Sequence, residues 1–156
     1  MAADFAPLLG TLRAQGLTLA TAESLTGGLL SKSITDVPGA SAVFRGGVVT
    51  YQTPVKASLL GVDQQLLDAY GPVCRPVARA MAEGVRQLLG ADLALSTTGV
   101  AGPDPDEFGA PVGLVYIALA GDGWCLCREL RLAGSRSLIR EMTCEAARDL
   151  LAEQLA

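Results

Sequence analysis

Segments with the pattern of a strand alternate along this chain with segments that have the pattern of a helix, and this alternation limits the possible fold most strongly. The strand-like segments are residues 17–22, 43–51, 93–98, 113–120 and 124–132. The helix-like segments are 4–16, 27–35, 63–71 and 76–89, with two more beginning at Thr53 and Ser135. Gly121-Asp122-Gly123 joins the last two strands as an antiparallel hairpin. The order predicts an α/β fold, a three-layer α/β/α sandwich around a mixed, mostly parallel sheet of about five strands.

Residue types within these segments predict their caps and their buried faces. Asp4, Asp63 and Ser135 are expected helix N-caps, and Gly16 is expected to end the first helix. Gly46-Gly47 is expected to interrupt the second strand. The helix over 76–89 is expected to bury Val77, Ala80, Met81, Gly84, Val85 and Leu88. The final helix is expected to bury Ile139, Met142, Ala146 and Leu150.

Length and composition narrow the classes of partner. Half of the 156 residues are apolar and 18% are charged, which favours one compact domain over 1–156. The net charge is −4, and no run of Lys or Arg is present. We therefore expect the chain to bind no nucleic acid and no membrane surface. No window reaches the roughly 18 apolar residues of a membrane span. Small molecules or other proteins are the expected partners.

The chain contains no histidine, and this absence limits its chemistry. Ser-His-Asp and Cys-His mechanisms and His-ligated metal sites are excluded. Only two lysines, Lys32 and Lys56, could serve as an amine base. The four cysteines show neither a disulfide framework nor two pairs at zinc-ligand spacing, and no signal-peptide pattern precedes them. We expect reduced thiols in a cytoplasmic protein, and no metal site.

The first candidate site lies where the strand over 17–22 leads into the glycine turn Gly27-Gly28. Ser24 would stand at the carboxyl end of that strand, where it could act as a nucleophile. Backbone N–H groups of Thr26, Gly27 and Gly28 could bind an oxyanion or a phosphate, and those over 99–102 are the alternative for the oxyanion. The alternative interpretation is an ordinary helix N-cap.

The second candidate is Lys56, in the first turn of the helix that begins at Thr53-Pro54. A solvated surface lysine is the ordinary interpretation. The helix macrodipole disfavours a cation at this end, however, and would lower the pKa of the Lys56 amine. A neutral Lys56 close to Ser24 could accept its proton, which is the Ser-Lys variant of nucleophilic catalysis.

The third candidate is the glycine loop over 96–103, which follows a buried strand. Here the backbone could approach a ligand, or the hydroxyls could satisfy their own turn. Arg136 and Arg140 lie four residues apart and so share one face of the last helix. They are either solvated charges or, if they face the glycine loops, phosphate ligands.

These residues together resemble the CinA C-terminal domain family, whose enzymatic members are nicotinamide-nucleotide amidases. The likeness covers nearly the whole chain. Four blocks carry it: Thr21-Ala22-Glu23-Ser24 with Thr26-Gly27-Gly28, 47–51 with Lys56, 98–103, and Pro111-Val112-Gly113. The resemblance implies an α/β/α fold in a cytoplasmic bacterial protein. It also implies hydrolysis of nicotinamide mononucleotide to nicotinate mononucleotide and ammonia, with no metal or organic cofactor.

By this resemblance Ser24 matches the family's nucleophile and Lys56 its base, while Tyr51 and Thr98 match residues of the same pocket. Arg136 is a further candidate for the phosphate. The expected substrate-binding residues are Tyr51, Thr26, Gly27, Gly28, Thr98, Gly99, Ala101, Gly102 and Arg140.

The chain departs from the family pattern at several positions. Leu25 stands where the family often has Cys, Cys74 where it has Ser, and Ser135 where it has an acidic residue. The loop over 104–110 reads Asp-Pro-Asp-Glu-Phe-Gly-Ala and lacks the usual second glycine and lysine. These differences bear on how the phosphate and the base of the nucleotide are recognised.

An alternative hypothesis is a non-catalytic nucleotide-binding or protein-interaction module linked to competence and DNA damage. The changed loop over 104–110 favours this alternative, whereas Ser24 and Lys56 favour the enzyme. We also expect a homo-oligomer.

Overall fold

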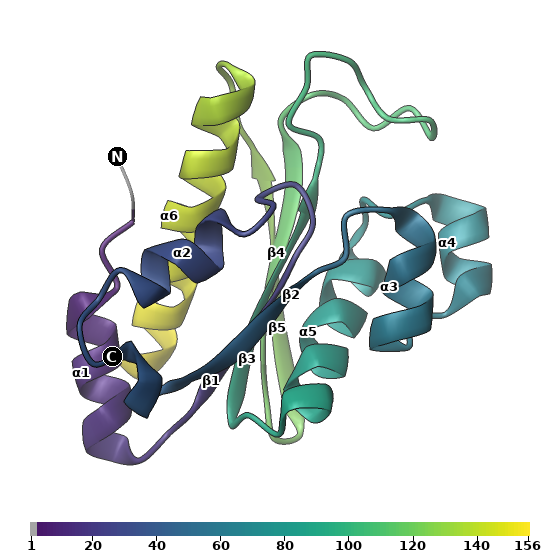
Figure 1. Ribbon diagram of the computed structural model, residues 1–156. Helices are drawn as coiled ribbons and strands as arrows, with labels where there is room; N and C mark the ends of the chain where they lie inside the picture. The colour runs from purple at the N-terminus through teal and green to yellow at the C-terminus, as the bar shows by residue number, and fades with distance from the viewer. Residues whose placement is uncertain (1–2) are drawn as a thin grey trace.

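A computed structural model describes residues 3–156 and confirms a mixed α/β sandwich (Figure 1). Over these residues one sheet of five strands has the order β2-β1-β3-β4-β5. The strands are β1 (Leu19–Glu23), β2 (Phe44–Val49), β3 (Leu93–Gly99), β4 (Leu114–Gly121) and β5 (Trp124–Arg131). β1 pairs in parallel with β2 and β3, and β4 runs antiparallel to β3 and β5. The carboxyl ends of β1, β2 and β3 therefore meet at one edge of the sheet.

Helices cover both faces of the sheet (Figure 1). They are α1 (Ala6–Gln15), α2 (Leu29–Thr35), α3 (Thr53–Leu60), α4 (Gln64–Tyr70), α5 (Arg75–Leu89) and α6 (Arg136–Leu155), with a 3-10 turn at Ala40–Ala42. α1, α2 and α6 lie on one face, whereas α5 crosses the other face and carries α3 and α4 beside it. Over residues 3–156, no helix has the length and apolarity needed to cross a membrane.

The ends of the elements follow the predicted caps, with one shift. Asp63 accepts the N–H of Gln65 at the start of α4, and Ser135 accepts the N–H of Leu138 at the start of α6. Gly16 ends α1 in the left-handed conformation that glycine adopts at little cost. At the start of α1 the N-cap is Phe5 rather than Asp4. The carboxylate of Asp4, the residue before this N-cap, still accepts the N–H of Ala6.

Gly46-Gly47 does not interrupt the second strand as expected, because β2 continues through both glycines as a β-bulge. Leu19 pairs with Phe44 and Ala20 with Gly46, so one residue of β2 is skipped. A side chain at Gly47 would collide with the hydroxyls of Thr21 and Ser31. The glycine therefore lets β2 lie close to β1 and α2, upstream of the segment that leads to α3.

The buried faces predicted for α5 and α6 are confirmed in part: Val77, Met81 and Val85 on α5, and Ile139 and Leu150 on α6, are buried. On α5, however, Leu88 is 49% exposed, whereas Ala78 and Ala82, which were not predicted, are buried against Ala118 and Ala120 of β4. On α6, Met142 and Ala146 are only half-buried, whereas Thr143 and Ala147 are buried. The Thr143 hydroxyl donates to the carbonyl of Ile139 one turn back, at 2.7 Å. That bond explains how a polar side chain can occupy the core.

Candidate functional site

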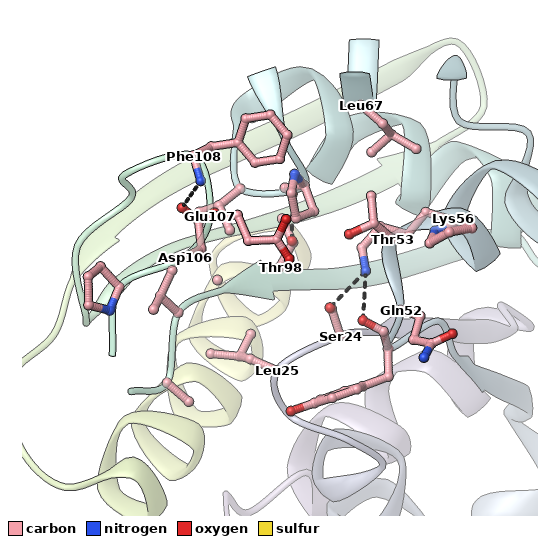
Figure 2. Close-up of a pocket in the computed structure, with 18 of the residues that line it drawn as sticks. Ser24, Leu25, Gln52, Thr53, Lys56, Leu67, Thr98, Asp106, Glu107 and Phe108 are labelled. Atoms are coloured by element: carbon pink, nitrogen blue, oxygen red, sulfur yellow. Dashed lines mark hydrogen bonds between the residues drawn. The ribbon is translucent and has the colours of Figure 1, made fainter. Parts of the chain in front are cut away.

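Ser24 and Lys56 meet at the edge where the parallel strands end. Ser24 directly follows β1, and Lys56 lies in the first turn of α3, which follows β2. The Nζ of Lys56 lies 2.9 Å from the Oγ of Ser24, as the dashed line in Figure 2 shows. β1 and β2 are parallel neighbours, so the segments after them emerge side by side. The fold thus brings together the two residues that sequence analysis paired.

Lys56 is fully buried. Its Nζ also lies 2.5 Å from the carbonyl oxygen of Thr50 and 3.5 Å from that of Tyr51. Among residues 3–156, no carboxylate lies within ion-pair distance of this amine. Burial lowers the pKa of Lys56 from 10.5 to about 8. The direction is the one expected from the sequence, but the cause is loss of hydration rather than the helix dipole.

The turn after Ser24 is held by a buried carboxylate that sequence analysis did not identify. Glu23 is fully buried, and one of its oxygens accepts the N–H of Gly28 at 3.2 Å and that of Leu30 at 2.8 Å. The other oxygen accepts from Ser31, through its N–H at 3.1 Å and its hydroxyl at 2.7 Å. Glu23 thus satisfies the first amides of α2. A charged residue in a strand that is otherwise apolar or small was the available signal.

These bonds decide which amides of the turn are open to a ligand. The N–H of Gly27 donates to the carbonyl of Ser24 at 3.0 Å, and that of Gly28 donates to Glu23. Of the three turn amides that we expected to bind the oxyanion, those of Gly27 and Gly28 are therefore engaged. Within the described part of the chain, the N–H groups of Leu25 and Thr26 donate to no protein atom. Leu25 also lines the cavity beside Ser24.

The loop after β3 forms a second wall of the site. Four residues that were predicted to bind the substrate line the cavity here: Thr98, Gly99, Ala101 and Gly102. The Thr98 hydroxyl donates to the carbonyl of Pro72 at 2.7 Å, which fixes its orientation. By contrast, the buried Thr26 hydroxyl lies 2.8 Å from that of Thr97, behind the turn. Three residues that were predicted to bind the substrate are not among the described residues that line the cavity: Thr26, Gly27 and Gly28.

The cavity itself is large enough for a nucleotide, with a volume of about 840 Å³. Its lining comes from the turn after β1, the start of α3, part of α4, the segment after β3 and the start of α6. The loop over 104–108 supplies five lining residues on the wall across from Lys56 (Figure 2). Tyr51, another residue predicted to bind the substrate, also lines the cavity and is 57% exposed.

Arg136 and Arg140 have different surroundings. Arg136 lines the cavity and donates to the carbonyl of Gly102 and, at 2.9 Å, to the hydroxyl of Tyr51. Arg140 instead donates to the carbonyls of Leu25 and Thr26, each at 2.9 Å, and lies outside the described lining. Arg140 therefore does not lie in the cavity, where we predicted that it would bind the phosphate. It holds the turn after Ser24 instead, because α6 packs against α2.

The site can be compared with known proteins. The chain is 54% identical over 149 residues to a CinA-like protein of Frankia casuarinae, which covers 96% of this chain and 34% of that protein. It is 52% identical over 143 residues to a CinA-like protein of Geobacter sulfurreducens, covering 92% and 35%. The chain thus spans about a third of the length of these curated relatives.

Solved structures agree in fold over nearly the whole chain. A competence-damaged protein (CinA) superfamily protein from Klebsiella pneumoniae has a TM-score of 0.93 and 31% identity, covering 96% of this chain and 94% of that one. A competence/damage inducible protein from Agrobacterium tumefaciens has a TM-score of 0.90 and 36% identity, covering 94% and 90%. The family model of the CinA C-terminal domain matches residues 5–155. The chain therefore belongs to the CinA C-terminal domain family.

Proposed function

We propose that this domain is an amidohydrolase that converts nicotinamide mononucleotide to nicotinate mononucleotide and ammonia through a Ser-Lys mechanism. The observation that carries the proposal is the buried Lys56 amine 2.9 Å from the hydroxyl of Ser24. A pKa of about 8 leaves roughly one-tenth of Lys56 neutral at pH 7. That fraction is far larger than for a hydrated lysine, and it provides a base in a chain without histidine.

The contacts of Lys56 suit the neutral amine. A neutral amine has two N–H donors and one lone pair, and the carbonyl oxygens of Thr50 and Tyr51 can only accept. If the two N–H groups donate to these carbonyls, the lone pair faces the Ser24 hydroxyl. Ser24 is then oriented to give up its proton as its Oγ forms a bond to the carboxamide carbon.

The rest of the reaction follows from this pair. The carbonyl π bond opens to give a tetrahedral oxyanion. The N–H of Leu25 is free and belongs to the residue directly after the nucleophile, so it can donate to this oxyanion. Lys56 then returns the proton to the amide nitrogen, and the C–N bond breaks. Ammonia departs, and the acyl group remains bound to Ser24 as an ester. Water adds to this ester, Lys56 accepts its proton, and the Ser24 oxygen leaves with that proton as the nicotinate product forms.

The substrate phosphate needs a cation in the cavity, and Arg136 is placed to supply it. Its guanidinium already bridges Tyr51 and Gly102 at the cavity wall, where it could turn toward a phosphate. The predicted homo-oligomer stays a prediction.

The first test is ammonia release from nicotinamide mononucleotide by the purified protein. We expect Ser24→Ala to lower turnover about 10⁴-fold or more, while calorimetry still detects nucleotide binding because the phosphate and ring contacts lie elsewhere. Turnover retained by Ser24→Ala would move the nucleophile to another hydroxyl, such as that of Thr98. A folded wild-type protein that binds the nucleotide but releases no ammonia would support the non-catalytic alternative.

The second test concerns pH. Since only the neutral amine of Lys56 can accept a proton, kcat/KM should rise as pH increases through about 8 and then level off. Lys56→Arg should abolish this activity at every pH, because arginine stays protonated. Lys32→Arg is the matched control, since Lys32 is exposed and pairs with Asp36 at 2.8 Å. A flat pH profile, or turnover retained by Lys56→Arg, would contradict the Ser-Lys mechanism.

The third test isolates the N–H of Leu25. Leu25 is the second residue of the turn that Gly27 closes on Ser24, a position where proline is favoured. Leu25→Pro removes the N–H, whereas Leu25→Ala keeps it and also loses the leucine packing. We expect kcat to fall about 10²–10³-fold further in the proline variant than in the alanine variant, with both shown to be folded by circular dichroism. Equal losses would exclude this N–H as the oxyanion donor.

The fourth test compares the two arginines. A charge-assisted hydrogen bond contributes about 1.5–3 kcal/mol, so Arg136→Ala should raise KM for the mononucleotide roughly 10–150-fold. It should change KM for nicotinamide riboside little, because the riboside has no phosphate. Arg140→Ala should instead impair both substrates alike, since Arg140 holds the carbonyls of Leu25 and Thr26. The phosphate must bind elsewhere if Arg136→Ala affects both substrates equally.

A further inference from the structure

Phe108 places an aromatic ring in the wall of the cavity. The residue is 50% exposed and lines the same cavity as Ser24 and Lys56. Figure 2 shows its ring across the cavity from the Ser24–Lys56 pair. The ring packs against the backbone of Gly71, where any side chain would collide with it. A large apolar ring is thus open to a ligand on the side away from Gly71.

The loop that carries Phe108 is braced from within. One carboxylate oxygen of Asp106 accepts the N–H of Phe108 at 3.0 Å and that of Ala110 at 2.7 Å. The N–H of Asp106 donates to the carbonyl of Ala110 at 3.1 Å. These bonds fix the loop as a compact turn, so the ring is held in place before a ligand arrives.

The wall around Phe108 is acidic. Four carboxylates line the cavity: Asp68, Asp104, Asp106 and Glu107. In the described residues Glu107 has no hydrogen bond or ion pair, and the second oxygen of Asp106 is buried without a partner. The cations of the described lining are Lys56, which burial keeps partly neutral, and Arg136, which contacts Tyr51 and Gly102 instead. A ligand at this wall therefore meets an aromatic face together with uncompensated negative charge.

We propose that Phe108 and Glu107 are specificity-determining residues that select an amide carried on a cationic aromatic ring. An aromatic face attracts a cation through its quadrupole, and a nearby carboxylate adds to that attraction. Nicotinamide mononucleotide has such a ring, a positively charged pyridinium that bears the carboxamide. Its dianionic phosphate would lie toward Arg136. The inference rests on the proposed function, which it deepens by stating what the cavity recognises in the ring.

The test compares nicotinamide mononucleotide with its dihydro form, which keeps the ribose, phosphate and carboxamide but has an uncharged, non-aromatic ring. Calorimetry on the Ser24→Ala protein measures both dissociation constants without turnover. We expect the oxidised form to bind about tenfold more tightly. Phe108→Leu and Glu107→Gln should each reduce that ratio about threefold. Asp122→Asn is the matched control, because Asp122 lies at the exposed hairpin tip away from the cavity and should leave the ratio unchanged.

Each outcome bears on the proposal separately from the proposed function. Equal binding of the two ring forms, or a ratio that neither Phe108→Leu nor Glu107→Gln changes, would overturn the inference even if the wild-type protein releases ammonia. A preference for the oxidised form that both variants weaken would support it even if no ammonia is released, in which case the proposed hydrolysis fails alone. Absence of binding for both forms would overturn the inference as well.

Discussion

The burial of the Lys56 amine without a carboxylate partner is the constraint on which the candidate site depends. Unfolded, this lysine holds its proton up to a pKa near 10.5, whereas in the native state the pKa falls to about 8. The unfolded state therefore binds more protons between these values, and stability rises with pH across that window. Below it, the buried charge costs about 3 kcal/mol of folding free energy. The two backbone carbonyls next to Nζ offset part of this loss of hydration, and the same loss of hydration makes the amine a usable base.

The fold supports this amine by satisfying the Ser24 turn from the side opposite the cavity. The buried Glu23 carboxylate takes the amides at the start of α2, and the Arg140 guanidinium takes the carbonyls of Leu25 and Thr26. The Glu23 carboxylate thus accepts from backbone N–H groups, whereas the Arg140 guanidinium donates to backbone carbonyl oxygens. In the described part of the chain, the N–H groups of Leu25 and Thr26 stay unpaired, and Leu25 lines the cavity beside Ser24. The Ser24 hydroxyl therefore faces a cavity whose adjoining backbone is already ordered before a substrate binds.

Much of this arrangement could be predicted because it depends on local signals and on topology. The absence of histidine and the scarcity of lysine singled out Ser24 and Lys56, and parallel strands bring their carboxyl ends together without further information. The role of Arg140 could not be predicted in this way. Periodicity places Arg140 on a face of α6 but does not say that this face meets the Ser24 turn. The difference in the buried face of α6 has a similar origin, since the Thr143 hydroxyl is satisfied within its own helix and can enter the core.

The loop over 104–110 and the Ser24–Lys56 pair depend on different parts of the fold. Ser24, Glu23 and Lys56 are held by strands and helix starts that are part of the core, so a change there would disturb the fold. The loop, by contrast, is braced mainly by its own Asp106 and by the contact of Phe108 with Gly71, and its charge can change without moving the core. In this chain Phe108 and three carboxylates of the loop, those of Asp104, Asp106 and Glu107, line the wall of the cavity. The side of the cavity across from Lys56 is therefore aromatic and acidic. The distance between Ser24 and Lys56 is set by β1, β2 and α3, which this loop does not enter.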